Sequence, residues 1–319
     1  MCVMRRAVLA AFVLWGCYAP QPPAGAPCDD QHPCPTGQVC IVGTCDGTIA
    51  MVDAPRGSGD GGSTQIDGGG TMTDLDGDGV LNAQDNCPMY SNASQANEDN
   101  DGLGDSCDPC PIDAANPPSD PDNDGVSDSC DPRPTTAGDT LTLFEGFRSG
   151  VPSTWQVIGG ATQVGSDINL NNVDRAALVP PINAPASGLV MIKAKYNATQ
   201  GPYDSALAVV MPYNPGQEQG VYCELYSPMA NSTNNRELDI WDSVPMVERA
   251  KKAYAWQTNT VYTMALRRTG NTYTCQATPN GGTTETVTGS TGSNPGTKIG
   301  AFMYGADVTV YWMLVVTSP

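Results

Sequence analysis

Histidine is almost absent from this chain of 319 residues, with His32 as the single copy. Serine and cysteine hydrolases pair their nucleophile with a histidine base, and histidine-rich zinc hydrolases need several imidazoles. Neither kind of site can therefore form in the C-terminal half. The chain also has no glycine-rich loop that follows a strand and opens a helix, so a nucleotide site has no support. These absences exclude several of the commonest catalytic chemistries.

Positive charge is scarce too, with 15 Lys and Arg against 34 Asp and Glu, and a net charge of −19. Residues 74–131 hold 14 Asp and one Glu but no Lys, Arg or His, so they carry −15 of that total. Residues 139–319 are nearly balanced, with 13 acids and 11 bases. This distribution argues against a nucleic-acid partner and points to bound cations in residues 74–131.

No apolar run is long enough to span a bilayer as a helix, which takes about 20 residues. The longest near the N-terminus, residues 7–15, follows Arg5-Arg6 and predicts an export signal. The sequence Leu14-Trp15-Gly16-Cys17 resembles a bacterial lipobox, which implies a signal peptide over residues 1–17 and a lipid on Cys17. The lipid would be the only membrane attachment, at the cell surface or outer membrane. Cleavage near Ala24-Gly-Ala26 with full secretion is the alternative.

What the chain does have is one loop pattern, repeated three times at a spacing of 23 within residues 74–131. Oxygen side chains occupy positions 1, 3, 5, 9 and 12 of each loop, glycine occupies position 6, and an apolar residue occupies position 7. Calcium needs six to eight oxygen ligands, and position 7 offers its carbonyl. The predicted Ca²⁺ ligands are Asp74, Asp76, Asp78, Val80, Asn82 and Asp85; Asn97, Asp99, Asp101, Leu103, Asp105 and Asp108; and Asp120, Asp122, Asp124, Val126, Asp128 and Asp131. An acidic disordered linker is the alternative, which the register of Gly, Cys and Asp opposes.

The cysteines of this segment follow the same period, and the simplest pairing is Cys87–Cys107 and Cys110–Cys130. The run from Asp85-Asn86-Cys87-Pro88 to Gly104-Asp105-Ser106-Cys107-Asp108 resembles thrombospondin type 3 repeats, over residues 74–131 only. That resemblance implies a calcium-wrapped stalk without regular helices or strands. Asn97 departs from the usual Asp at position 1, so we expect the middle site to be weaker.

The other cysteines suggest disulfides, because an exported chain favours them over zinc. Residues 28–45 form a cysteine-rich module with Cys28, Cys34, Cys40 and Cys45, for which a zinc site with His32 is the alternative. Residues 46–73 are a glycine-rich linker. If Cys2 leaves with the signal and Cys17 carries lipid, Cys223 and Cys275 remain. We expect them to bridge neighbouring strands, with two buried free thiols as the alternative.

Residues 139–319 predict an all-β fold, because short runs rich in Val, Ile, Thr and Tyr alternate with Asn, Gly and Pro. The expected strands are 188–196, 205–212, 220–226, 236–241, 261–266, 273–277, 300–304 and 308–316. The motifs Phe144-Glu145-Gly146-Phe147 and Ile299-Gly300-Ala301-Phe302 resemble concanavalin A-like, laminin-G-like sandwiches. The resemblance implies a lectin-like jelly roll, whose core we expect to fold without metal.

One carboxylate motif, Glu237-x-Asp239-x-x-Asp242, resembles the E-x-D-x-x-E strand of jelly-roll glucanases. Asp242 lies an odd number of residues from Glu237, so a regular strand turns it to the other face. The alternative is a strand with Leu238 and Ile240 inward. Taken together, the sequence predicts a calcium-binding surface lipoprotein that adheres to a glycan or matrix protein. The competing hypothesis is a glycoside hydrolase that uses Glu237, Asp239 and Asp242.

Overall fold

The computed structural model describes residues 74–115, 118–200, 204–229 and 235–319, together with three short strands nearer the N-terminus. The chain divides into two compact units, Met1–Gly69 and Gly70–Pro319. In the first unit, strands β1 (Ala26–Pro27), β2 (Val39–Ile41) and β3 (Thr44–Asp46) pair antiparallel in the order β1-β3-β2. The predicted lipid on Cys17 and the side chains of the four cysteines of residues 28–45 lie outside the described part.

The calcium-loop segment contains turns and bends but no helix or strand wherever residues 74–131 are described. Two disulfides cross-link it, Cys87–Cys107 and Cys110–Cys130, each closing a separation of 20 residues. These are the pairs that the period of 23 predicts. Such bridges matter here because the segment buries few apolar side chains of its own.

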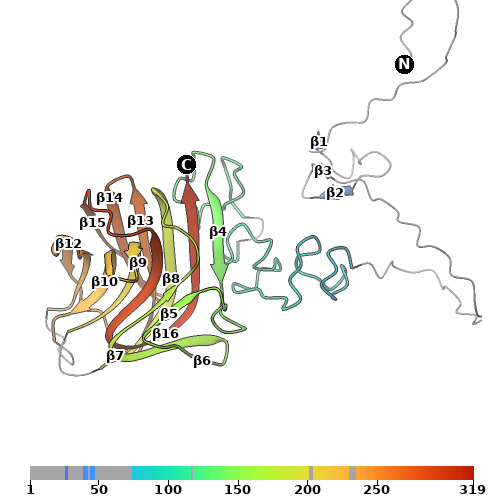
Figure 1. The fold of residues 1–319 in the computed structure, drawn as a ribbon. Helices are drawn as coiled ribbons and strands as arrows, with labels where there is room; N and C mark the ends of the chain where they lie inside the picture. Colours follow the sequence, from blue (N-terminus) through green and yellow to red (C-terminus); the bar gives the residue numbers. More distant parts are fainter. Residues whose placement is uncertain are drawn as a thin grey trace, which may run out of the picture. The chain divides into compact units, whose positions relative to one another are not determined.

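The described strands of the second unit all pair antiparallel and form the sandwich (Figure 1). They are β4 (Thr140–Glu145), β5 (Gln156–Ile158), β6 (Thr162–Val164), β7 (Asp167–Val179), β8 (Ser187–Thr199), β9 (Ser205–Asn214), β10 (Gln219–Ser227), β11 (Glu237–Asp242), β12 (Val247–Ala253), β13 (Thr260–Thr269), β14 (Thr272–Pro279), β15 (Glu285–Ser290) and β16 (Lys298–Ser318). The main path of hydrogen-bonded neighbours runs β12-β11-β10-β9-β16-β8-β13-β14-β15.

Within the described residues, no helix is long and apolar enough to cross a membrane.

Strand β16 belongs to both layers of the sandwich. Its first part, around Ala301–Tyr304, pairs with β9 and β7, whereas its last part, from Trp312 to Ser318, pairs with β8 and β4. The first layer therefore contains β12, β11, β10, β9 and β7, and the second layer contains β15, β14, β13, β8 and β4. The expected fold class, an all-β jelly-roll sandwich preceded by repeats without regular structure, is confirmed.

The apolar core fills the space between the two layers, with side chains such as Ile192, Val209 and Met264 fully buried. Cys223 of β10 and Cys275 of β14 form a disulfide there. The expected partners are correct, but the expectation that the bridge joins neighbouring strands is wrong, because β10 and β14 are not adjacent in the strand order. The disulfide instead ties one layer to the other.

The third repeat packs on the outer face of the second layer. Val126 and the Cys110–Cys130 disulfide share a buried apolar cluster with Leu189, Trp312 and Leu314. The repeats and the sandwich therefore fall in one compact unit, Gly70–Pro319.

Candidate metal centre

Each repeat bends around carboxylates that accept hydrogen bonds from the loop's own backbone. In the first loop, Asp74 Oδ1 accepts from Gly77 N at 2.8 Å, and its Oδ2 accepts from Gly79 N at 2.9 Å. At position 5, Asp78, Asp101 and Asp124 each accept the N–H of the residue two places on, at 2.7–3.0 Å. These turns point the carboxylates toward the inside of the loop.

Glycine is required at position 6 because the backbone there is left-handed. The φ angles are +94° at Gly79, +109° at Gly102 and +90° at Gly125. A side chain would be strained in this conformation, so glycine lets the chain turn sharply enough to bring positions 1 to 5 together.

The predicted carboxylates do converge in every loop. Ligand oxygens lie within 4.8 Å of one another in three groups, Asp74, Asp76 and Asp78; Asp99, Asp101 and Asp108; and Asp120, Asp122 and Asp124. Asn82 and Asp105, at position 9, each turn one oxygen to the backbone N–H of position 2, at 2.9 and 2.8 Å. Calcium coordination by the position 7 carbonyls of Val80, Leu103 and Val126 stays a prediction.

Buried carboxylate oxygens without any hydrogen-bond donor recur at equivalent places in the three loops. At position 3 they belong to Asp76, Asp99 and Asp122, and at position 12 to Asp85, Asp108 and Asp131. Asp128, at position 9, has another. An anionic oxygen that is removed from water without a partner is costly, so these oxygens fit a bound cation.

Electrostatics at position 12 agree with this fit. Burial raises the pKa of Asp108 to about 6 and that of Asp131 to about 7. Other carboxylates nearby add to both shifts. Oxygen ligands in this number and arrangement suit calcium, which would supply the positive charge that the repeats lack.

A second candidate site is a cavity of about 720 Å³ on the outer face of the first layer. Its lining includes the aromatic side chains of Tyr222, Tyr226 and Trp241 and the carboxylates of Glu224, Glu237 and Asp239. The aromatic and acidic residues alternate along β10 and β11, since Tyr222 lies opposite Trp241 and Glu224 lies opposite Asp239. This face combines flat apolar surfaces with hydrogen-bond acceptors.

Glu224 and Asp239 form a buried carboxyl pair, with 8% and 3% of each residue exposed. Burial, followed by the neighbouring carboxyl, raises the pKa of Asp239 to about 10. Burial also raises that of Glu224 to about 7, and the two groups share a hydrogen bond. One carboxyl must therefore be protonated for the pair to form. Asp239 Oδ1 is buried and has no hydrogen-bond partner.

The structure does not assemble the predicted trio of Glu237, Asp239 and Asp242. Asp242 points to the opposite face of β11, where it accepts from Arg249 Nη2 at 2.7 Å and from Thr291 Oγ1 at 2.6 Å. Although burial opposes it, these bonds lower the pKa of Asp242. The register of β11 with β10 is regular through Asp242, so no bulge there brings it round. Leu238 and Ile240 point into the core.

Sequence reasoning missed four acidic residues of the cavity, Asp204, Glu218, Glu224 and Glu248. Glu248 of β12 lies close enough to Glu237 and Asp239 for their ligand oxygens to fall within 4.8 Å. Lys251 Nζ contacts Glu248 at 3.0 Å and Glu237 at 3.6 Å, so one of these two negative charges is already balanced. No motif in the sequence marks Glu224 or Glu248, because they lie on β10 and β12, the strands that flank β11.

Comparisons with known proteins agree with parts of this description. Residues 72–95, which include the first loop, match the family model for the thrombospondin type 3 repeat. No curated protein matches the chain. The sequence resemblance to these repeats is thereby confirmed for the first loop.

Several solved structures are similar to the chain. A peanut lectin is 12% identical with a TM-score of 0.42 and covers 56% of this chain and 97% of its own. Lectin I-B4 from Griffonia simplicifolia is 12% identical with a TM-score of 0.41, covering 55% and 98%. The carbohydrate-binding module CBM66 from Bacillus subtilis is 7% identical with a TM-score of 0.39, covering 49% and 91%.

Proposed function

We propose that the chain is an exported calcium-binding protein in which each of the three loops holds at least one calcium ion. The observation that carries this proposal is the set of buried, donor-free carboxylate oxygens at positions 3 and 12 of all three loops. Bound calcium would neutralise the carboxylates of each loop. The loop residues hold those carboxylates in place through turns closed by backbone N–H groups.

Replacement of a position 3 carboxylate tests this function. Asp122→Asn removes one charge from the third loop and should weaken one calcium site by about tenfold or more, because affinity follows the number of charged ligands. Asp174→Asn is the matched control, since Asp174 is exposed and lies outside the repeats. Calcium titration calorimetry on the full chain provides the measurement. Equal titrations for both variants and wild type would contradict the proposal.

For the sandwich we propose ligand binding at the cavity of β10 and β11, with a glycan as the ligand and adhesion to a glycan or matrix as the role. Aromatic faces such as Trp241 stack on sugar rings, and carboxylates accept hydrogen bonds from sugar hydroxyls. Glycoside hydrolysis through Glu237 and Asp239 is less well supported, because their predicted partner Asp242 is bound to Arg249 on the other face.

We further propose that the protein is anchored at the cell surface by a lipid on Cys17, as Leu14-Trp15-Gly16-Cys17 and the even number of remaining cysteines suggest. Mass spectrometry of the exported protein should find an acylated Cys17 at its N-terminus, and Cys17→Ser should release the protein from membranes. A mature wild-type protein that starts at Pro27 would rule the anchor out.

A further inference from the structure

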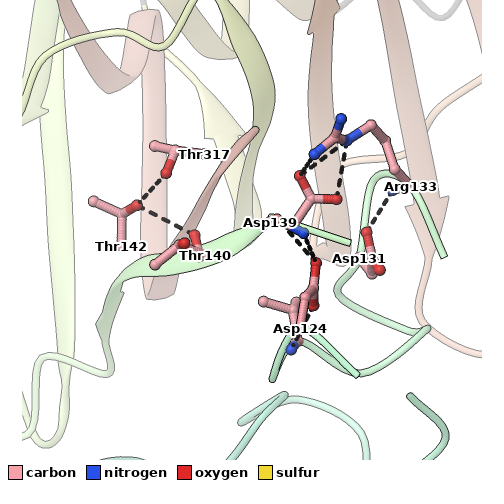
Figure 2. A network of polar contacts seen from close by, with 9 residues as sticks. Asp124, Asp131, Arg133, Asp139, Thr140, Thr142 and Thr317 are labelled. Carbon is pink, nitrogen blue, oxygen red and sulfur yellow. Dashed lines mark hydrogen bonds and ion pairs between the residues drawn. The ribbon is translucent and has the colours of Figure 1, made fainter. Parts of the chain in front are cut away.

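Asp139 lies where the third repeat meets the sandwich, and its side chain is buried with 2% of the residue exposed. It directly precedes β4 and is not part of the 23-residue pattern. Ligand oxygens of Asp124, Asp131 and Asp139 nevertheless lie within 4.8 Å of one another. Figure 2 shows the backbone N–H of Asp139 donating a hydrogen bond to Asp124, with Asp131 beside them.

Residues 133–139 occupy the place that residues 87–93, which follow the first loop, occupy in the first repeat. Asp78 Oδ2 accepts the N–H of Asn92, 14 residues later, at 2.7 Å. Asp124 Oδ2, the equivalent atom of the third loop, accepts the N–H of Gly138 at the same separation, at 2.9 Å. It also accepts the N–H of Asp139 at 2.6 Å. The start of the sandwich thus continues the repeat geometry.

Arg133 stands at the position of Cys87 and Cys110 in the earlier repeats. The backbone N–H of all three residues donates to Oδ1 of the position 12 aspartate. Cys87 and Cys110 form disulfides with the next repeat, but the third repeat has no successor. Arg133 instead pairs with Asp139, with Nη2 at 3.0 Å and Nε at 3.2 Å from Oδ1.

The charges at this junction do not balance. Three carboxylates lie beside one guanidinium, so two negative charges have no cationic partner when all three are ionised. Asp131 has 8% of its surface exposed, and its buried Oδ2 receives no hydrogen bond. The deficit equals the charge of one divalent cation, and a carboxylate oxygen without a donor is the atom that such an ion would satisfy.

We propose that Asp139 is a further calcium ligand, which joins Asp124 and Asp131 so that the sandwich itself completes the third calcium site. The inference rests on the proposed calcium binding of the loops. Asp139 leads into β4, whose Thr140 pairs with Thr317 of β16. Thr142 Oγ1 lies 2.9 Å from Thr317 Oγ1 (Figure 2). A calcium ion held by Asp139 therefore stabilises the edge of the sandwich as well as the loop.

The test compares calcium-induced shifts in the melting temperature of the sandwich in full-length variants. Wild type should melt at a higher temperature with calcium than without it. Asp139→Asn should lose at least half of that shift and weaken one site by about tenfold, as expected when a charged ligand becomes neutral. Asp174→Asn, the exposed control, should behave as wild type.

Arg133→Met separates a ligand from a simple ion-pair partner. It breaks the pair with Asp139 but keeps all three carboxylates, so it should lower the melting temperature without calcium and retain the full calcium-induced shift. If Asp139→Asn and Arg133→Met lowered stability alike and both kept the calcium shift, the inference would be overturned. That result would leave the proposed function intact, because wild type would still bind calcium. If wild type bound no calcium at all, the proposed function itself would be overturned.

Discussion

Removal of calcium is expected to open the first two repeats while the third repeat stays partly protected. Residues 74–108 carry an excess of carboxylates and bury few apolar side chains, so bound metal is the main term that favours their compact form. At a free calcium concentration of 100 times Kd, each ion contributes about 2.7 kcal/mol, which corresponds to about a hundredfold change in local opening. The third repeat has an additional source of stability, because Val126 and Cys130 are buried against the sandwich.

Hydrogen exchange followed by mass spectrometry measures this gradient. Protection should fall by about a hundredfold or more in residues 74–108, and by less in residues 110–131. Trypsin cannot report it, because residues 74–131 contain no Lys or Arg. Chelator that is saturated with calcium beforehand is the control. If protection were lost first in residues 139–319 while the repeats stayed protected, the assignment of metal to the loops would be wrong.

Replacement of Asp239 by Asn is expected to stabilise the sandwich at neutral and alkaline pH and to remove ligand binding. The pKa values of Asp239 and Glu224 in the folded state, about 10 and about 7, lie above the usual value near 4. Between about pH 4 and these raised pKa values, the folded state holds more protons than the unfolded state. Stability therefore falls as pH rises, by up to about 1.4 kcal/mol per pH unit for each proton. Below about pH 4 both carboxyls are protonated in the folded and the unfolded state, so they no longer lower the stability of the fold.

Melting curves between pH 5 and pH 8, at saturating calcium, provide the measurement. Asp239→Asn should flatten the decline of wild type, because the amide cannot ionise and can still bond to Glu224. Asp242→Asn is the matched control on the same strand, and it should lose on the order of 2 kcal/mol at pH 7 because Arg249 loses its partner. A glycan array should give a signal for wild type and Asp242→Asn but not for Asp239→Asn. Destabilisation of Asp239→Asn at pH 8 would contradict the account of the pair.

The carboxylate clusters of the three loops were predictable from the sequence because their members lie close together along the chain. Twelve consecutive residues, a glycine with positive φ and cysteines that recur at the period of 23 specify the turn, and nothing distant is needed to place Asp76 beside Asp78. Asp139 was not predictable in this way. It enters the third site through the packing of the repeat on the sandwich, and only the structure brings residues 131 and 139 together.

The sandwich was predictable in class but not in detail. Strand β12, Val247–Ala253, was missed because Glu248, Lys251 and Lys252 make it polar on both sides, as an exposed strand at the end of the sheet can be. The expected strands 300–304 and 308–316 are one strand, β16, because the chain passes through Gly305 without leaving the sheet. The pairing of aromatic and acidic residues in the cavity depends on the register of β10 with β11, which the periodicity within one strand cannot reveal.

A count of bound calcium ions on the wild-type full chain tests the central claim most directly. Titration calorimetry should find three or more sites, with dissociation constants of ~10⁻⁴–10⁻³ M, as is typical of extracellular calcium modules. The loop that begins with Asn97 should be among the weaker sites, because an amide replaces a carboxylate at position 1. A chain that binds no calcium, or a single ion, under these conditions would contradict the claim that the three loops are metal sites.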